Sequence, residues 1–265
     1  MKRYVRFLLS LLLHGLDSPR NAGRRWLGRQ TPGTCVVLYY HGVPAQHRQR
    51  FARQLDLLLE QASPLPSQPK TPLAAGRHHA VVTFDDGFVS VLEQARPELD
   101  QRGIPWTVFV PSGLLGQTPG WLRRAPDAAR QDRVMTAEEL RDLARDPQVT
   151  IGSHTVNHTH LIEAGPARAA EEFARSKAEL EAALDRSVDQ FSYPFGARSP
   201  ALDELGRQAG YRRLFCSVPA RAFQTADEFV TGRANVNPDM PLLEFRLKLA
   251  GAYRWLARRH RGLHR

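Results

Sequence analysis

Two adjacent carboxylates, Asp85 and Asp86, follow the apolar run at residues 80–84 and precede a glycine. A short β-branched stretch that stops in Asp-Asp-Gly places both acids side by side at the end of a strand. Two carboxylates this close repel each other unless a proton or a cation relieves the repulsion. His154 and His158, which directly follow another apolar run, are candidates to hold such a cation.

Histidines at positions i and i+4 of a helical turn project to the same side, close enough to share a metal ion. Two imidazoles and one carboxylate form a common ligand set for catalytic zinc, with one position left for water. One aspartate would then be a ligand, and the other would take a proton from that water. Spacing alone does not assign Asp85 and Asp86 to these roles. Asp-Asp-Gly by itself is an ordinary turn, so only its pairing with the histidines favours chemistry.

Apolar runs alternate with helical patterns from residue 35 onward, which predicts a parallel sheet. About seven such units predict an α/β fold with a closed or nearly closed barrel, and an open doubly wound sheet is the alternative. The expected strands are 35–40, 80–83, 107–110, 149–153, 190–193, 214–218 and, more weakly, 230–236. The expected helices are 51–61, 89–101, 136–145, 167–184, 202–209 and 242–259. All strands of a parallel barrel end on one face, so the acids and the histidines should meet in space.

The chain has 265 residues and a formal net charge of +10, and arginines gather near both of its ends. Basic termini favour an anionic partner such as a lipid surface, nucleic acid or acidic glycan, and a solvated Arg-rich surface is an equally good interpretation. Specific nucleic-acid binding is not expected, because the arginines do not alternate with aromatic residues in any recognised module. Cys35 and Cys216 lie in apolar runs and are expected to be buried thiols.

Residues 1–13 have a basic head and a short apolar stretch. That stretch is too short to span a bilayer, and no clear cleavage site follows it. It is either a basic amphipathic helix on a membrane surface or a helix packed on the domain, and the sequence does not separate the two. The first interpretation places the protein at the periphery of the bacterial cytoplasmic membrane, with the side unassigned. We expect three parts: a basic segment and linker (1–34), a main domain (35–240) and a basic C-terminal helix (241–265).

Three motifs in order resemble the polysaccharide deacetylases, carbohydrate esterase family 4: Thr83-Phe-Asp-Asp-Gly87, His154-Thr-Val-Asn-His158 and Tyr193-Pro-Phe-Gly196. The stretch Val37-Leu-Tyr-Tyr-His-Gly-Val43 is similar to the opening strand of one branch of that family. The resemblance covers about residues 35–240. It is specific because it rests on three ordered motifs rather than on one.

The resemblance implies a distorted (β/α)7-type barrel that hydrolyses N-acetyl groups on amino sugars of a polysaccharide or a lipid-linked glycan. By analogy Asp85 is the general base. Asp86, His154 and His158 hold a divalent metal, usually zinc. The backbone N–H of Phe195 would stabilise the tetrahedral oxyanion.

The sequence departs from the family pattern at three points. The third motif often begins with an arginine that orients the base, and here that position is Ser192. Arg233 is a candidate to replace it. The late Leu-x-His motif that supplies the general acid is not visible, and His41 is a candidate for that role, with a purely structural histidine as the alternative. The Asp…Trp motif that flanks the general acid is also missing.

These departures keep a second hypothesis open, a non-catalytic glycan-binding or scaffold protein on the same fold. Aromatic residues near the motifs offer sugar-stacking surfaces, and core packing is the alternative for each. Core packing is favoured for Trp106 and less strongly for Trp121, which lies in a Gly- and Pro-rich insertion at residues 112–133.

Overall fold

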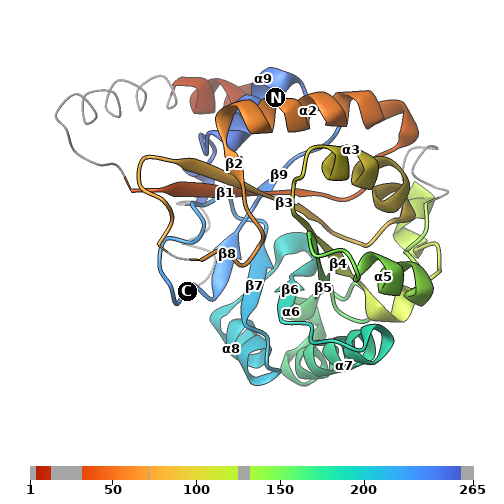
Figure 1. The fold of residues 1–265 in the computed structure, drawn as a ribbon. Coiled ribbons are helices and arrows are strands. Elements are labelled where there is room, and N and C mark those ends of the chain that lie inside the picture. Colours follow the sequence, from red (N-terminus) through yellow and green to blue (C-terminus); the bar gives the residue numbers. More distant parts are fainter. Residues whose placement is uncertain (1–3, 13–31, 71, 125–131, 258–265) are drawn as a thin grey trace.

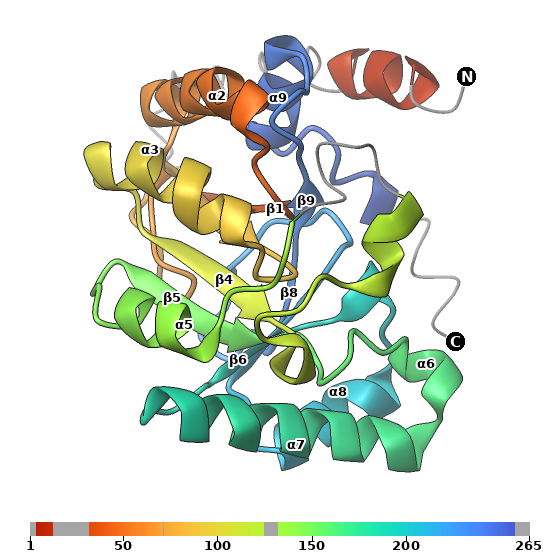
Figure 2. The ribbon, with the colours of Figure 1, turned by 90° about the vertical axis from the view of Figure 1, so that its right-hand side faces the viewer.

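The computed structural model describes residues 4–12, 32–70, 72–124 and 132–257. Most of the predicted linker and the last basic residues lie outside these ranges. Parallel strands form the centre of the molecule, and helices surround them on the outside (Figures 1 and 2). A further helix at residues 4–12 lies beside the last helix, α9.

The strands match the predicted positions closely. They are β1 (Thr34–Tyr40), β2 (Ser63–Pro64), β3 (His78–Phe84), β4 (Trp106–Val110), β5 (Val149–Ser153), β6 (Gln190–Ser192), β7 (Arg213–Cys216), β8 (Val230–Gly232) and β9 (Ala234–Asn235). The α-helices are α2 (Arg48–Gln61), α3 (Arg96–Gln101), α5 (Ala137–Leu143), α6 (Leu161–Ala164), α7 (Pro166–Leu184), α8 (Pro200–Gln208) and α9 (Leu242–Leu249). The short strand β2 and the short helix α6 were not predicted from the sequence.

The sheet closes on itself almost completely. Its strands pair in the order β8-β7-β6-β5-β4-β3-β1-β9, and every pairing along this path is parallel. The two edge strands, β8 and β9, are separated in the chain by Arg233 alone. One chain segment therefore pairs with β7 through its first half and with β1 through its second half. This confirms the predicted barrel and rejects the open sheet.

Alternation along each strand separates two cores. Inside the barrel, one side of β1, β3, β4 and β7 packs together as Cys35, Val37, Val81, Phe109 and Phe215. The opposite side of the strands packs against the helices in a larger cluster, which includes Trp106. Because side chains repeat every two residues, Asp85 follows Val81 and Thr83 on the inner side, at the end where β3 stops.

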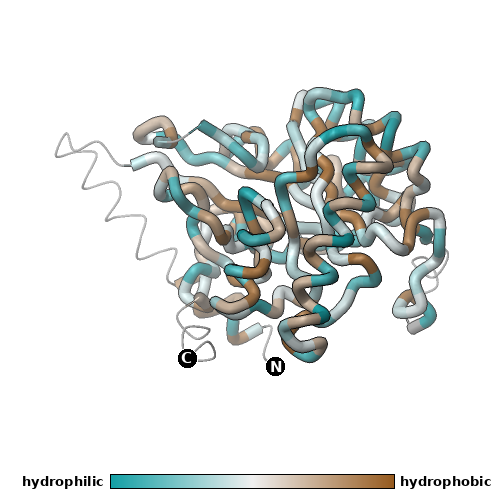
Figure 3. The backbone as a smooth tube through the Cα atoms, turned by 90° about the horizontal axis from the view of Figure 1, so that it is seen from below, coloured by the Kyte–Doolittle hydropathy of each residue, from teal (hydrophilic) through white to brown (hydrophobic). Residues whose placement is uncertain are grey.

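Local signals place the helices as predicted. Thr136 and Glu139 form a capping box at the start of α5. Phe173, Leu180 and Leu184 are all buried on one side of α7. Hydropathy along the backbone alternates in the helical stretches, as expected for helices with one buried face (Figure 3).

The last helix is shorter than the predicted helix at 242–259. Helix α9 ends at Leu249, and turns follow over residues 251–255. Gly251 has a φ of +70°, a left-handed conformation that ends a helix. The two cysteines are buried and free, as predicted.

Candidate active site and metal centre

The predicted acids lie at the carboxyl end of β3, inside the mouth of the barrel. Asp85 donates its backbone N–H to the carbonyl of Tyr40, at 2.9 Å, which continues the pairing between β1 and β3. Asp86 turns away from the strand with a φ of +68°. Both side chains are buried. The chain thus brings two carboxylates together at a buried strand end, where each needs a separate partner.

Asp86, His154 and His158 come together as the predicted metal-ligand set. The Asp86 carboxylate oxygen Oδ1 lies 3.6 Å from Nε2 of His154 and 3.4 Å from Nε2 of His158. One potential ligand atom from each residue lies within 4.8 Å of the other two. Among the described residues, Asp86 Oδ1 is buried without a hydrogen-bond donor. A buried carboxylate oxygen that faces two imidazole nitrogens fits a divalent cation.

The environment of the histidines prepares them as ligands. His154 hydrogen-bonds through Nδ1 to the carbonyl of Ser192, at 2.7 Å, so Nδ1 carries the proton and Nε2 presents its lone pair to Asp86. Burial lowers the pKa of His154 to about 4 and that of His158 to about 3, which keeps both imidazoles neutral. Burial, with the charges of Asp85 and Asp132, raises the pKa of Asp86 to about 8. A cation at this site would stabilise the ionised form of Asp86.

Arg233, the candidate named from the sequence, pairs with Asp85. Its guanidinium donates two hydrogen bonds of 2.8 Å, one to each carboxylate oxygen, and a third of 2.7 Å to the hydroxyl of Ser192. Both side chains of the pair are almost fully buried, at 0% and 4% exposure. Burial alone would raise the pKa of Asp85, but the charges of Arg233 and His154 and the hydrogen bonds hold it at about 2. Arg233 therefore contacts both Asp85 and Ser192, the residue that stands where the third motif often has an arginine.

Aromatic rings hold the Arg233 guanidinium in the barrel. Its central carbon lies 4.5 Å from the ring centroid of Tyr39, 5.3 Å from that of Phe109 and 5.8 Å from that of Phe215. These contacts favour a buried cation, and the planar group cannot move without losing them.

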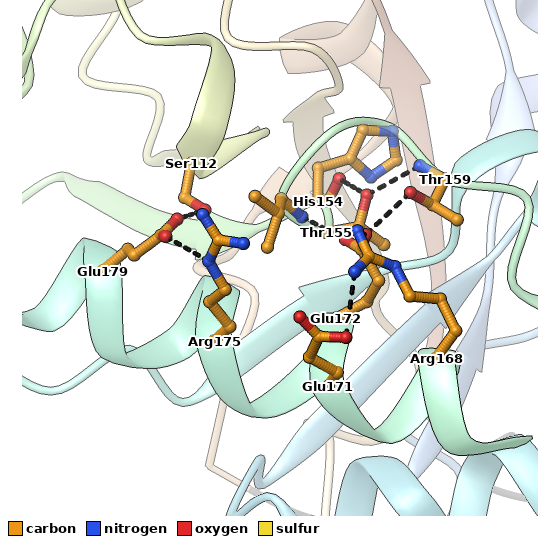
Figure 4. A network of polar contacts seen from close by, with 10 residues as sticks. Ser112, His154, Thr155, Thr159, Arg168, Glu171, Glu172, Arg175 and Glu179 are labelled. Atoms are coloured by element: carbon orange, nitrogen blue, oxygen red, sulfur yellow. Dashed lines mark hydrogen bonds and ion pairs between the residues drawn. The ribbon is translucent and has the colours of Figure 1, made fainter.

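A buried carboxylate on α7 holds the loop that carries both histidines. Glu172 accepts hydrogen bonds from the backbone N–H of Val156 at 2.7 Å, from the hydroxyl of Thr159 at 2.9 Å and from Arg168 at 2.9 Å. Figure 4 shows these groups converging on the loop from α7. The hydroxyl of Thr155 accepts a further hydrogen bond from the backbone N–H of Thr159, at 3.0 Å. Sequence reasoning missed Glu172, because nothing local distinguishes it from the exposed acids of the same helix.

The loop after β4 holds the histidine loop from the other side. The N–H groups of Ser112 and Gly113 donate to the carbonyls of Thr155 and Val156, at 3.1 and 2.8 Å. A Cβ at Gly113 would lie 2.7 Å from a methyl carbon of Val156, so only glycine permits this approach. The first residues of the predicted insertion at 112–133 thus support the loop that carries His154 and His158.

Two aromatic side chains form a wall beside the ligands. The ring of Trp121 lies 4.4 Å from that of His158, and the ring of Phe195 lies 4.7 Å from it on another side. Both aromatic side chains are exposed, whereas Trp106 is buried in the core. Trp121 is therefore available for a ligand, and Trp106 is not.

His41 and Asp132 complete the surroundings. The His41 side chain is reachable by solvent, yet protein surrounds it closely enough that desolvation lowers the pKa of its imidazole. It lies near enough to Asp85, His154 and His158 for its charge to act on all three. Asp132, which the sequence did not reveal as a site residue, accepts hydrogen bonds from the N–H groups of Ser90 and Arg133.

Backbone strain is concentrated at this site. Asp86, Thr155, His158 and Phe195 all have φ between +56° and +68° without being glycines. Such conformations cost about 1–3 kcal/mol each and persist where the surroundings enforce them. Here the strained residues are two of the candidate metal ligands, Asp86 and His158, and two residues beside the ligands, Thr155 and Phe195.

The model of the polysaccharide deacetylase family matches residues 74–214, just over half of the chain. This chain belongs to the polysaccharide deacetylase family. It is 22% identical over 229 residues to YxkH of Bacillus subtilis, whose name assigns it to the same family, over 81% of this chain and 76% of that protein.

Solved structures of other deacetylases have the same fold. IcaB from Ammonifex degensii superposes with a TM-score of 0.67 at 27% identity, over 84% of this chain and 98% of its own. The deacetylase PplD of Streptococcus pyogenes, solved with acetate, gives 0.66 at 19% identity, over 83% of this chain and 99% of its own, which shows the fold alone. As a polysaccharide deacetylase, this chain is a metal-dependent hydrolase that acts on amide bonds, and it has an Asp-His-His site for the metal.

Proposed function

We propose that this protein removes N-acetyl groups from the amino sugars of a polysaccharide or a lipid-linked glycan, with zinc as the metal. Asp86, His154 and His158 would hold the ion. When bound, it would act as a Lewis acid and lower the pKa of the attacking water. The products would be acetate and a free amine.

Asp85 is suited to accept the proton of that water. With a pKa of about 2 it is ionised at neutral pH, and its two oxygens are fixed by Arg233. A carboxylate with so low a pKa is a weak base, so its contribution would come more from position than from basicity. Arg233 is a positioning residue in this scheme, because its guanidinium contacts Asp85.

Phe195 and His41 are proposed for the other two tasks. The backbone of Phe195 has a φ of +60° in the short turn Pro194–Gly196 after β6, and its ring lies 4.7 Å from that of His158. Its N–H would donate to the oxyanion of the tetrahedral intermediate. His41, on the opposite side of the barrel mouth, would give a proton to the leaving amine as general acid.

The pairing of Asp85 with Arg233 beside the three ligands is the observation that carries this proposal. A ligand cluster alone would suit a structural ion. A second, separately ionised carboxylate next to an exposed aromatic wall adds the base and the access that hydrolysis needs.

Acetate release is the direct test. The purified protein, loaded with zinc, is incubated with N-acetylated oligosaccharides and with lipid-linked N-acetyl sugars, and acetate is measured. We expect release that a chelator abolishes and zinc restores. Asp85→Asn should keep the metal and lose the activity. A protein that binds no divalent metal, or an Asp85→Asn variant as active as the wild type, would disprove the proposal.

The alternative of a non-catalytic glycan-binding protein rested on the missing arginine and the missing general acid. Arg233 now supplies a guanidinium at Asp85 and removes the first reason. Sugar binding without acetate release across the whole substrate set would support the alternative.

A further inference from the structure

The helix at residues 4–12 docks on the domain through one narrow face. Phe7 packs against a small apolar cluster, which consists of Leu247 in α9 and of Ala252 and Tyr253 just after it. Ser10 is fully buried and accepts a hydrogen bond from the indole N–H of Trp255, at 2.9 Å. These contacts fix the orientation of the helix, and Figure 2 shows it beside α9.

An apolar stripe covers the opposite face of the same helix. Val5, Leu8, Leu9 and Leu12 follow the spacing i, i+3, i+4 and i+7, which is one side of a helix. They are 59%, 58%, 39% and 65% exposed. At about 100° per residue, the centre of this stripe lies about 180° around the helix from the face of Phe7 and Ser10. A helix packed on a soluble domain normally turns its apolar stripe inward, so this outward stripe needs a partner.

The N-terminal part of the sequence is strongly basic. The first 30 residues contain one acidic residue, Asp17, and seven basic ones: Lys2, Arg3, Arg6, Arg20, Arg24, Arg25 and Arg29. In the structure, Arg6 is exposed on the helix itself, three residues before Leu9 of the stripe. An outward apolar stripe on a helix within a strongly basic segment is the pattern of a helix that lies in the interface of an anionic bilayer.

We propose that the face formed by Val5, Leu8, Leu9 and Leu12 docks this protein onto the surface of an anionic lipid membrane. A second copy of the chain is a poorer occupant, because it would bring two arginine-rich segments together. In the described part of the chain, no helix is long and apolar enough to cross a bilayer.

The docking proposal does not depend on the proposed deacetylation, because vesicle binding and acetate release are separate measurements.

The test compares binding to phosphatidylcholine vesicles with and without phosphatidylglycerol, by flotation of the full-length protein. We expect binding that requires the anionic lipid. The double substitution Leu8→Glu and Leu12→Glu should weaken it by at least about tenfold, because it places charge in the apolar face. Ile162→Glu, at a 51% exposed apolar residue on α6, is the matched control and should bind as the wild type does.

Circular dichroism and thermal unfolding check the fold of both variants. We expect both to be folded, because the exchanged side chains are exposed. Acetate release from a soluble oligosaccharide, measured in parallel, reports on the proposed function separately. Absence of vesicle binding in the wild type would overturn the inference. So would binding that salt abolishes but the double substitution leaves unchanged, since that is nonspecific attraction of the basic segments. A wild-type dimer that the double substitution converts to a monomer would also overturn it.

Discussion

Replacing Arg233 by methionine tests the arrangement on which the proposed chemistry depends. The substitution keeps much of the side-chain volume and removes the guanidinium from a carboxylate that it contacts twice at 2.8 Å. Asp85 stays buried, so an uncompensated charge is left behind. Breaking a buried ion pair in this way costs about 3–5 kcal/mol. That is a large part of the about 5–15 kcal/mol by which domains are stable.

The pH dependence of activity should change in a defined direction. In the wild type Asp85 has a pKa of about 2 and is ionised throughout the usual assay range. Without Arg233 the cost of burial is no longer offset, so the pKa of Asp85 rises and the acid limb of kcat moves to higher pH. At neutral pH we expect kcat to fall at least about a hundredfold through loss of orientation, with a smaller change in KM.

Arg213→Met is the matched control. Arg213 is another buried arginine of the barrel, but it donates to the carbonyl of Glu228 and the hydroxyl of Thr231 at the opposite end of the strands. Its loss should lower stability without moving the acid limb. If Arg233→Met is too unstable, the double substitution with Asp85→Asn removes both charges and should regain stability in urea unfolding. A folded Arg233→Met variant with wild-type kcat and an unmoved acid limb would refute the reasoning.

Three further predictions concern other parts of the molecule. Glu172→Gln should weaken zinc binding by about 10–100-fold in a chelator competition, because the loop that carries both histidines loses a buried carboxylate acceptor. Glu171→Gln, on the same helix, is the control and should leave zinc binding unchanged. Glu139→Gln should lower the free energy of unfolding by about 1 kcal/mol at pH 7. Hydrogen bonds from Arg133 lower the pKa of Glu139 to about 2, so the stabilisation is present above the unfolded pKa and is lost as the pH falls toward 2, where urea unfolding of the two proteins should converge. His41→Gln should reduce kcat by about 100- to 10,000-fold with the zinc content retained, and unchanged turnover would exclude His41 as the acid.

Prediction from the sequence succeeded where the deciding interactions are local. The strand before Asp85, the capping box at Thr136 and the apolar stripe of α7 depend on neighbours a few residues apart. The meeting of the two acids with the two histidines also followed, because the strands of a parallel barrel all end on one face. The choice of Asp86 over Asp85 as the ligand came from the family resemblance. Helix α9 was overestimated, since a helical pattern of apolar residues continues past the turn at Gly251.

Contacts between distant segments could not be predicted in the same way. Glu172 has the same neighbours in sequence as an exposed acid, and only the approach of the 154–159 loop makes it a buried acceptor. Asp132 joins the site because the insertion returns to the barrel mouth beside Ser90. Neither residue belongs to a pattern with a fixed spacing.

The sequence by itself determined the chemistry of this protein: two acids at one strand end and two histidines at another, in a chain that alternates strands and helices. Only the tertiary structure decided which cation pairs with Asp85. Arg233 lies 148 residues away in the chain, and it reaches Asp85 because it sits where the last strand closes the barrel. Closure is a property of the whole sheet, which requires every strand to be in place. The structure likewise decided which face of the 4–12 helix is free, because Phe7 and Ser10 are fixed by residues near the other end of the chain.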